Sequence, residues 1–211
     1  MYLKGDLQVM AAGSGLRGYG LVRAPQRPCA ARHAANRYNA PRTEKTNPMF
    51  AAAQLTGATK PEQYRELAEQ ARGLLHDERD RIANAANFAA LVYHALPDLN
   101  WAGFYFFDGS GLVVGPFQGK PACVRIALGK GVCGTAAATR QTQVVRNVDD
   151  FPGHIACDSA SRSEIVVPLV ANGRLLGVWD VDSPRVARFD EDDRQGMEEL
   201  ARIFVDSLGV S

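Results

Sequence analysis

Residues 100–119 read NWAGFYFFDGSGLVVGPFQG, and this stretch predicts two antiparallel strands joined by a tight turn. Aromatic and β-branched residues, which favour strands, lie on both sides of the turn-forming tetrapeptide DGSG at 108–111. A second hairpin is predicted at residues 163–184, SEIVVPLVANGRLLGVWDVDSP, where Asn172-Gly173 is a strong signal for a short turn. The two hairpins together predict an antiparallel sheet.

The first predicted strand has two different faces, because side chains alternate along a strand. Phe104 and Phe106 share one face, which we expect to pack in the core. Trp101, Gly103 and Tyr105 share the other, and they would leave a gap at the glycine between two rings. Such a gap could hold a small apolar group, although Trp and Tyr often form only the rim of a core.

Helices are predicted on both sides of the hairpins in the sequence. Apolar residues at helical spacing indicate helices at about 61–75, 79–96 and 190–208. The remaining expected elements are a short strand near 123–127, a helix opened by the glycine-rich turn in 129–141, a brief strand at 142–148 and a polar loop up to 164. This order predicts an α+β fold in which N-terminal and C-terminal helices flank a central antiparallel sheet.

The first 48 residues differ in composition from the rest of the chain. They carry eight Lys and Arg against two Asp and Glu and have no sustained apolar periodicity, so they are predicted to be a disordered basic tail. A start assigned upstream of Met49 is our preferred explanation, and an organellar targeting segment is the alternative. Residues 50–211 are predicted to form one domain.

The bulk properties of the chain exclude several classes of protein. A net charge of +1 argues against a dedicated nucleic-acid binder. No stretch approaches the roughly 18 consecutive apolar residues of a membrane-spanning helix, and no apolar signal segment is present, so we expect a cytoplasmic location and no membrane partner.

The chain has four cysteines: Cys29 in the tail, and Cys123, Cys133 and Cys157 in the domain. Three cysteines cannot all pair within one domain, which disfavours a purely structural disulfide framework, and small inert core residues are the plainest alternative. Two features favour reactive thiols. Cys133 lies at a predicted helix start, where the helix dipole stabilises a thiolate, and Cys157 lies in the polar run GHIACDSASRSE at 153–164.

A zinc site formed by His154 and the three thiols of the domain is conceivable. Structural zinc sites usually contain a closely spaced C-x2–4-C pair, however, and this chain has none. We therefore expect no bound metal.

Three carboxylates form a second candidate group. Asp180 and Asp182 are two residues apart on a predicted strand and face the same way, and Glu164 begins the neighbouring strand. They could simply line a solvent-exposed face of the sheet. If they converge, they would suit an ammonium group, or their mutual repulsion would raise a pKa enough to create a proton donor.

Three segments closely resemble the free methionine-(R)-sulfoxide reductases, a catalytic branch of the GAF-domain fold. These are NWAGFYFF at 100–107, GPFQGKPACVRIALGKGVCGTAAATRQTQVVRNVDDFPGHIACDSASRSEIVVPL at 115–169 and GRLLGVWDVDSP at 173–184. The resemblance covers residues 61–208, and the cysteine spacings distinguish this branch from GAF sensor domains. It implies a GAF-like domain that reduces free L-methionine (R)-sulfoxide to L-methionine.

The resemblance also implies roles for individual residues. Cys157 matches the nucleophile, which becomes a sulfenic acid, and Cys123 matches the resolving cysteine, which forms a disulfide with it that thioredoxin reduces. Cys133 matches a third cysteine that serves as an alternative resolver. Trp101 and Tyr105 match the aromatic wall that contacts the S-methyl group of the substrate. Glu164, Asp180 and Asp182 match the acidic cluster that contacts its ammonium and sulfoxide groups. Of these three, Glu164 is expected to be the proton donor.

No cofactor is implied beyond thioredoxin as the external reductant, and a homodimer is plausible by analogy with other GAF domains. The helix start alone favours Cys133 as the nucleophile, whereas the resemblance favours Cys157, which we follow. The main alternative is a non-catalytic GAF module that binds a small ligand or senses redox state.

Overall fold

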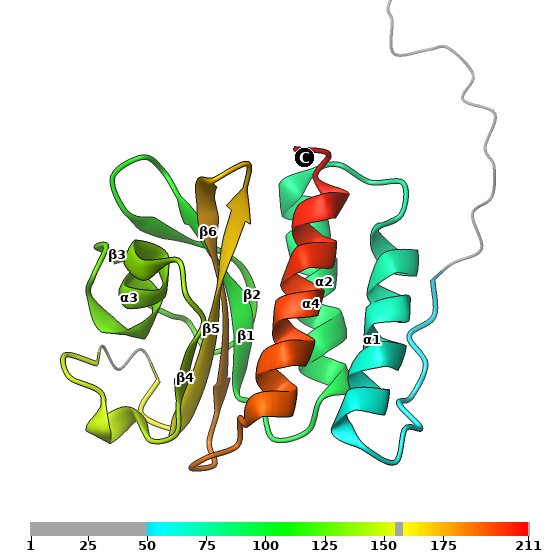
Figure 1. Ribbon diagram of the computed structural model, residues 1–211, viewed down its shortest axis with the longest axis horizontal. Coiled ribbons are helices and arrows are strands. Elements are labelled where there is room, and N and C mark those ends of the chain that lie inside the picture. Colours follow the sequence, from blue (N-terminus) through cyan, green and yellow to red (C-terminus); the bar gives the residue numbers. More distant parts are fainter. Residues whose placement is uncertain (1–49, 155–157, 211) are drawn as a thin grey trace, which may run out of the picture. The chain divides into compact units, whose positions relative to one another are not determined.

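The computed structural model describes residues 50–154 and 158–210, and its centre is one six-stranded antiparallel sheet (Figure 1). The strand order is β3-β2-β1-β6-β5-β4. The strands are β1 (Trp101–Phe107), β2 (Leu112–Gly119), β3 (Arg125–Ile126), β4 (Gln143–Val145), β5 (Ser163–Ala171) and β6 (Arg174–Ser183). The order brings β1 and β6, which are far apart in sequence, side by side in the middle of the sheet.

Both predicted hairpins are present, and their turns follow from local chemistry. Between β1 and β2, one carboxylate oxygen of Asp108 accepts hydrogen bonds from the backbone N–H groups of Ser110 and Gly111. Between β5 and β6, Asn172 and Gly173 have φ values of 49° and 73°. Two successive left-handed residues give the turn that matches the twist of a hairpin, which explains the Asn-Gly sequence.

Four α-helices complete the domain: α1 (Lys60–Leu75), α2 (Arg81–Ala95), α3 (Gly131–Thr139) and α4 (Glu191–Ser207). Capping side chains set the starts of the three long helices, with Thr59, Asp80 and Asp190 each accepting a backbone N–H. The sequence did not anticipate one short element, the 3-10 turn Val148–Asp150 within the polar loop.

The helices divide between the two faces of the sheet (Figure 1). Helices α2 and α4 cover one face, where Phe104 of β1 packs against Phe204 of α4 and Trp179 of β6 with ring centroids 4.4 and 4.7 Å apart. Helix α1 packs on the outer side of these two helices. Helix α3 lies on the other face. The predicted α+β fold and the core role of the phenylalanine face are thus confirmed.

The predicted tail, residues 1–48, lies outside the described residues and stays a prediction. Among the residues that are described, no helix combines the length and the apolar character needed to cross a membrane.

A buried ion network ties α1 to α4. The carboxylate of Asp193 is fully buried and accepts hydrogen bonds from the Tyr64 hydroxyl at 2.8 Å and the Arg188 guanidinium at 2.9 Å, and it also contacts the Lys60 ammonium. The network therefore links α1, α4 and the segment that precedes α4 through one buried carboxylate.

Replacing Asp193 by alanine should lower the free energy of unfolding by about 3–5 kcal/mol, because the change leaves Arg188 with an uncompensated charge in a buried position. Denaturant unfolding measures this loss. The neighbouring Asp192→Ala is the matched control, since Asp192 is exposed and its replacement should change stability by less than about 0.5 kcal/mol. Equal effects of the two changes would contradict the structural role of the network.

Candidate active site

The strand register gathers the predicted carboxylates on the sheet face that α3 covers. Asp182 of β6 pairs with Trp101 of β1 on one side and with Glu164 of β5 on the other. Asp180 pairs with Gly103 in the next row of the same face. Glu164 and Asp180 are each only 6% exposed, so the alternative of a solvent-exposed acidic face is wrong.

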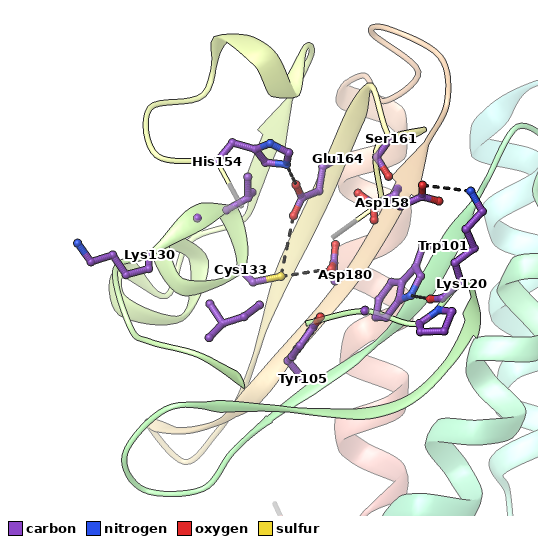
Figure 2. A pocket seen from close by; sticks show the side chains of 16 residues that line it. Trp101, Tyr105, Lys120, Lys130, Cys133, His154, Asp158, Ser161, Glu164 and Asp180 are labelled. Atoms are coloured by element: carbon purple, nitrogen blue, oxygen red, sulfur yellow. Dashed lines mark hydrogen bonds and ion pairs between the residues drawn. The ribbon is translucent and has the colours of Figure 1, made fainter. Parts of the chain in front are cut away.

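Helix α3 adds a thiol to this group (Figure 2). The Cys133 Sγ lies in the first turn of the helix and donates to Asp180 Oδ2 at 3.2 Å, and it is 3.9 Å from Glu164 Oε1. Burial raises the pKa of this thiol well above its usual value, and the two carboxyl groups raise it further. The expectation of a thiolate stabilised by the helix start is therefore wrong, because the dipole of a short helix is outweighed by burial beside acidic groups.

The acidic cluster retains protons near neutral pH. Burial raises the pKa of Glu164 and of Asp182 well above the usual range, and the nearby Asp180 raises both further. Burial also raises the pKa of Asp180, to about 7. The buried Glu164 and Asp180 and the half-buried Asp182 cannot all ionise together without a cation, so at least one of the three stays protonated.

Aromatic rings form the adjoining wall of the pocket. The rings of Trp101 and Tyr105 are stacked with centroids 5.8 Å apart, and Trp101 also stacks on Phe117 at 5.3 Å. The expected gap at Gly103 is not there, because a Cβ atom at this position would lie 2.6 Å from the Trp101 ring and 2.3 Å from the Phe117 Cβ. The glycine instead makes room for the indole, which lies across the strand.

Replacing Gly103 by alanine should therefore displace the indole or the strand that carries Phe117, at a loss of about 1–3 kcal/mol of stability. Thermal unfolding and the emission of the tryptophans measure this change. The control is Gly73→Ala on an exposed part of α1, where the added Cβ meets only the distant Phe50 ring at 3.8 Å. That change should leave stability equal or higher. If Gly103→Ala were as harmless, the indole would not depend on the glycine.

Most polar side chains at the rim of the pocket were not predicted from the sequence, which singled out only His154, as a possible zinc ligand. Asn100 donates to the Ser161 hydroxyl at 2.9 Å, and Lys120 forms an ion pair with Asp158 at 3.2 Å. The His154 imidazole lies 3.7 Å from a Glu164 oxygen. For the contact between Asn100 and Ser161, the only signal in the sequence is the position of Asn100 directly before β1. That position does not identify Ser161 as the partner.

Two of the three cysteines of the domain are described, and they are in different states. Cys133 is a free buried thiol, whereas Cys123, half-buried between β2 and β3, is disulfide-bonded. A Cys123–Cys133 pairing is therefore excluded, and so is a zinc site that uses both as thiolates in this state. Cys157 lies outside the described residues, but the described residues on either side of it, His154 and Asp158, both line the pocket.

Comparisons with known proteins identify the family of this domain. The GAF domain pattern matches residues 63–208. The free methionine-R-sulfoxide reductase of Escherichia coli is 50% identical over 141 residues, which are 67% of this chain and 86% of that protein. The chain belongs to the free methionine-R-sulfoxide reductase family of GAF domains.

Solved structures extend the similarity of the domain. The free methionine-R-sulfoxide reductase of Neisseria meningitidis, in complex with its substrate, is 46% identical with a TM-score of 0.74, over 77% of this chain and 98% of that one. A protein of Burkholderia vietnamiensis described as a GAF sensor is 73% identical with a TM-score of 0.70, over 72% of this chain and 99% of that one.

Proposed function

We propose that the chain reduces free L-methionine (R)-sulfoxide to L-methionine by cysteine chemistry. The observation that carries this function is the pocket itself, in which a buried acidic cluster adjoins an aromatic wall. The carboxylates Glu164, Asp180 and Asp182 suit the substrate ammonium and the sulfoxide oxygen. The rings of Trp101 and Tyr105 suit the S-methyl group.

Cys157 is the nucleophile in this proposal. Its sulfur takes the sulfoxide oxygen, so that the thiol is oxidised to a sulfenic acid while the sulfoxide is reduced and methionine leaves. The rival thiol, Cys133, is a poor nucleophile because its raised pKa keeps it protonated at neutral pH. This contrast supports the assignment made from the family resemblance.

Glu164 is the proton donor to the sulfoxide oxygen. Its pKa is raised by burial and by Asp180, so the carboxyl keeps its proton at neutral pH and can share it with the oxygen that leaves the substrate sulfur. Asp180 and Asp182 then bind the substrate ammonium, which compensates the negative charge of their ionised forms.

Cys123 completes the cycle as the resolving thiol. It attacks the sulfenic acid of Cys157, water leaves, and a disulfide forms, which an external dithiol such as thioredoxin reduces by exchange. The disulfide-bonded state of Cys123 is in keeping with this role, and the free Cys133 is left as an alternative resolver. The reducing conditions of the cytoplasm would maintain this supply of dithiol.

A non-catalytic GAF module is the second candidate, and the similarity to the Burkholderia protein described as a sensor is the observation that favours it. Single-turnover chemistry separates the two. Reduced protein mixed with an excess of free (R)-sulfoxide, without reductant, should release about one equivalent of methionine and lose two thiols. A sensor would bind the ligand without releasing methionine, and that result would overturn the proposed function.

A further inference from the structure

The geometry of the pocket points to a second ligand: we infer that Cys133, Glu164 and Asp180 bind one Zn²⁺ ion, which excludes the amino-acid substrate. These residues are a different set from the thiols considered in the sequence. The binding of the ion is independent of the proposed function, whereas the inhibition that follows from it rests on that function.

Two of the three separations between the ligand atoms are close to those found in a zinc site. Cys133 Sγ lies 3.2 Å from an oxygen of Asp180 and 3.9 Å from an oxygen of Glu164, and all three atoms lie within 4.8 Å of one another. In a tetrahedral site with ordinary Zn–S and Zn–O bonds, neighbouring ligand atoms are roughly 3.5 Å apart. The two separations from sulfur, drawn as dashed lines in Figure 2, lie close to that value, so a small shift of the side chains would place the three atoms on one face of a coordination tetrahedron.

A buried acceptor of the same group is open to a cation. The Oδ1 atom of Asp180 is buried and has no hydrogen-bond partner, although the residue is only 6% exposed. Within residues 50–154 and 158–210, neither Lys nor Arg forms an ion pair with any carboxylate of the cluster, and His154 is the one basic side chain in ion-pair range. When the cluster is ionised, a buried carboxylate oxygen without a donor is costly, and a divalent cation would satisfy it.

The donor set decides which cation fits. A thiolate together with carboxylates favours Zn²⁺ and its spectroscopic substitute Co²⁺ over Mg²⁺ and Ca²⁺, which prefer oxygen alone. The thiol proton of Cys133 and the proton held by the two carboxyl groups pass to solvent as the metal–ligand bonds form, and no oxidation or reduction is involved. The His154 imidazole, 3.7 Å from Glu164, is within reach of the fourth position.

Occupation of this site should block catalysis. The carboxylates of Glu164 and Asp180 are those that the proposed function gives to the substrate, so the metal and the substrate would compete for them. Zn²⁺ would then inhibit by raising the KM for the sulfoxide rather than by lowering kcat.

Titration of the reduced full-length protein with Co²⁺ tests the site without measuring activity. We expect a thiolate-to-cobalt charge-transfer band in the near ultraviolet, strong visible bands of four-coordinate Co²⁺, and loss of both on addition of Zn²⁺. Cys133→Ser should abolish the charge-transfer band and weaken Zn²⁺ binding by about 100-fold or more. The control Cys123→Ser removes a different thiol and should keep the band.

Other outcomes overturn the inference. A band that survives Cys133→Ser, or that disappears in Cys123→Ser, would assign the metal to other thiols. X-ray absorption at the zinc edge of the unaltered protein needs no variant: one sulfur ligand is expected, and two or more would contradict the site. Absence of the band in protein that still releases methionine would refute the metal site alone, whereas a band in protein that releases none would refute the proposed function alone.

Discussion

Replacing Cys157 by serine should lower single-turnover release of methionine from free methionine (R)-sulfoxide by roughly 10³-fold or more. A serine hydroxyl stays protonated at neutral pH and is a far weaker nucleophile than a thiolate toward sulfur. Rapid mixing of reduced protein with substrate, followed by chromatography of free methionine, measures the effect.

Two variants serve as controls for this result. Cys123→Ser should keep the first turnover and slow the cycle driven by thioredoxin, because it removes the resolving thiol and leaves the nucleophile. Cys133→Ser should also keep the first turnover. Stoichiometric methionine from Cys157→Ser, or loss of the first turnover in Cys133→Ser alone, would transfer the nucleophilic role to the buried thiol.

Glu164→Gln should lower kcat by about 10²–10⁴-fold while the fold is retained. Glutamine has nearly the same shape but cannot transfer a proton to the departing oxygen, and Glu164 is placed for that transfer by its position at the start of β5 beside Asp180. Steady-state kinetics with a chemical dithiol measures the loss without involving thioredoxin.

The same substitution on α1 gives a matched control. Glu69 is exposed and distant from the pocket lining, so Glu69→Gln should leave kcat and KM unchanged. If Glu164→Gln raised KM and left kcat intact, Glu164 would bind the substrate rather than protonate it.

Much of the fold could be predicted because its signals are local. Alternation in NWAGFYFF separated the phenylalanine face from the Trp-Gly-Tyr face, and Asn172-Gly173 marked the turn that fixes the β5–β6 register. That register then brings Glu164 beside Asp182, so the convergence of the acidic groups was accessible from strand positions alone.

The remaining features depend on contacts between segments that are distant in the sequence. The helix start at Cys133 was visible, but the two carboxyl groups that raise its pKa come from β5 and β6. The sequence indicated an open space at Gly103, but it did not indicate that the indole of Trp101, on the same strand, fills that space. Asn100 and Ser161 meet only in three dimensions. The role of Cys157 still rests on the family resemblance.

The most direct test of the proposed function is one NADPH-coupled assay with thioredoxin and thioredoxin reductase, which compares three substrates at equal concentration. These are free methionine (R)-sulfoxide, free methionine (S)-sulfoxide and a peptide that contains methionine (R)-sulfoxide. The buried carboxylates and the aromatic wall predict NADPH consumption with the free (R)-sulfoxide and little or none with the peptide, and the family predicts little or none with the free (S)-sulfoxide. Equal rates with the peptide, or with the free (S)-sulfoxide, would contradict a pocket built for the free (R) amino acid.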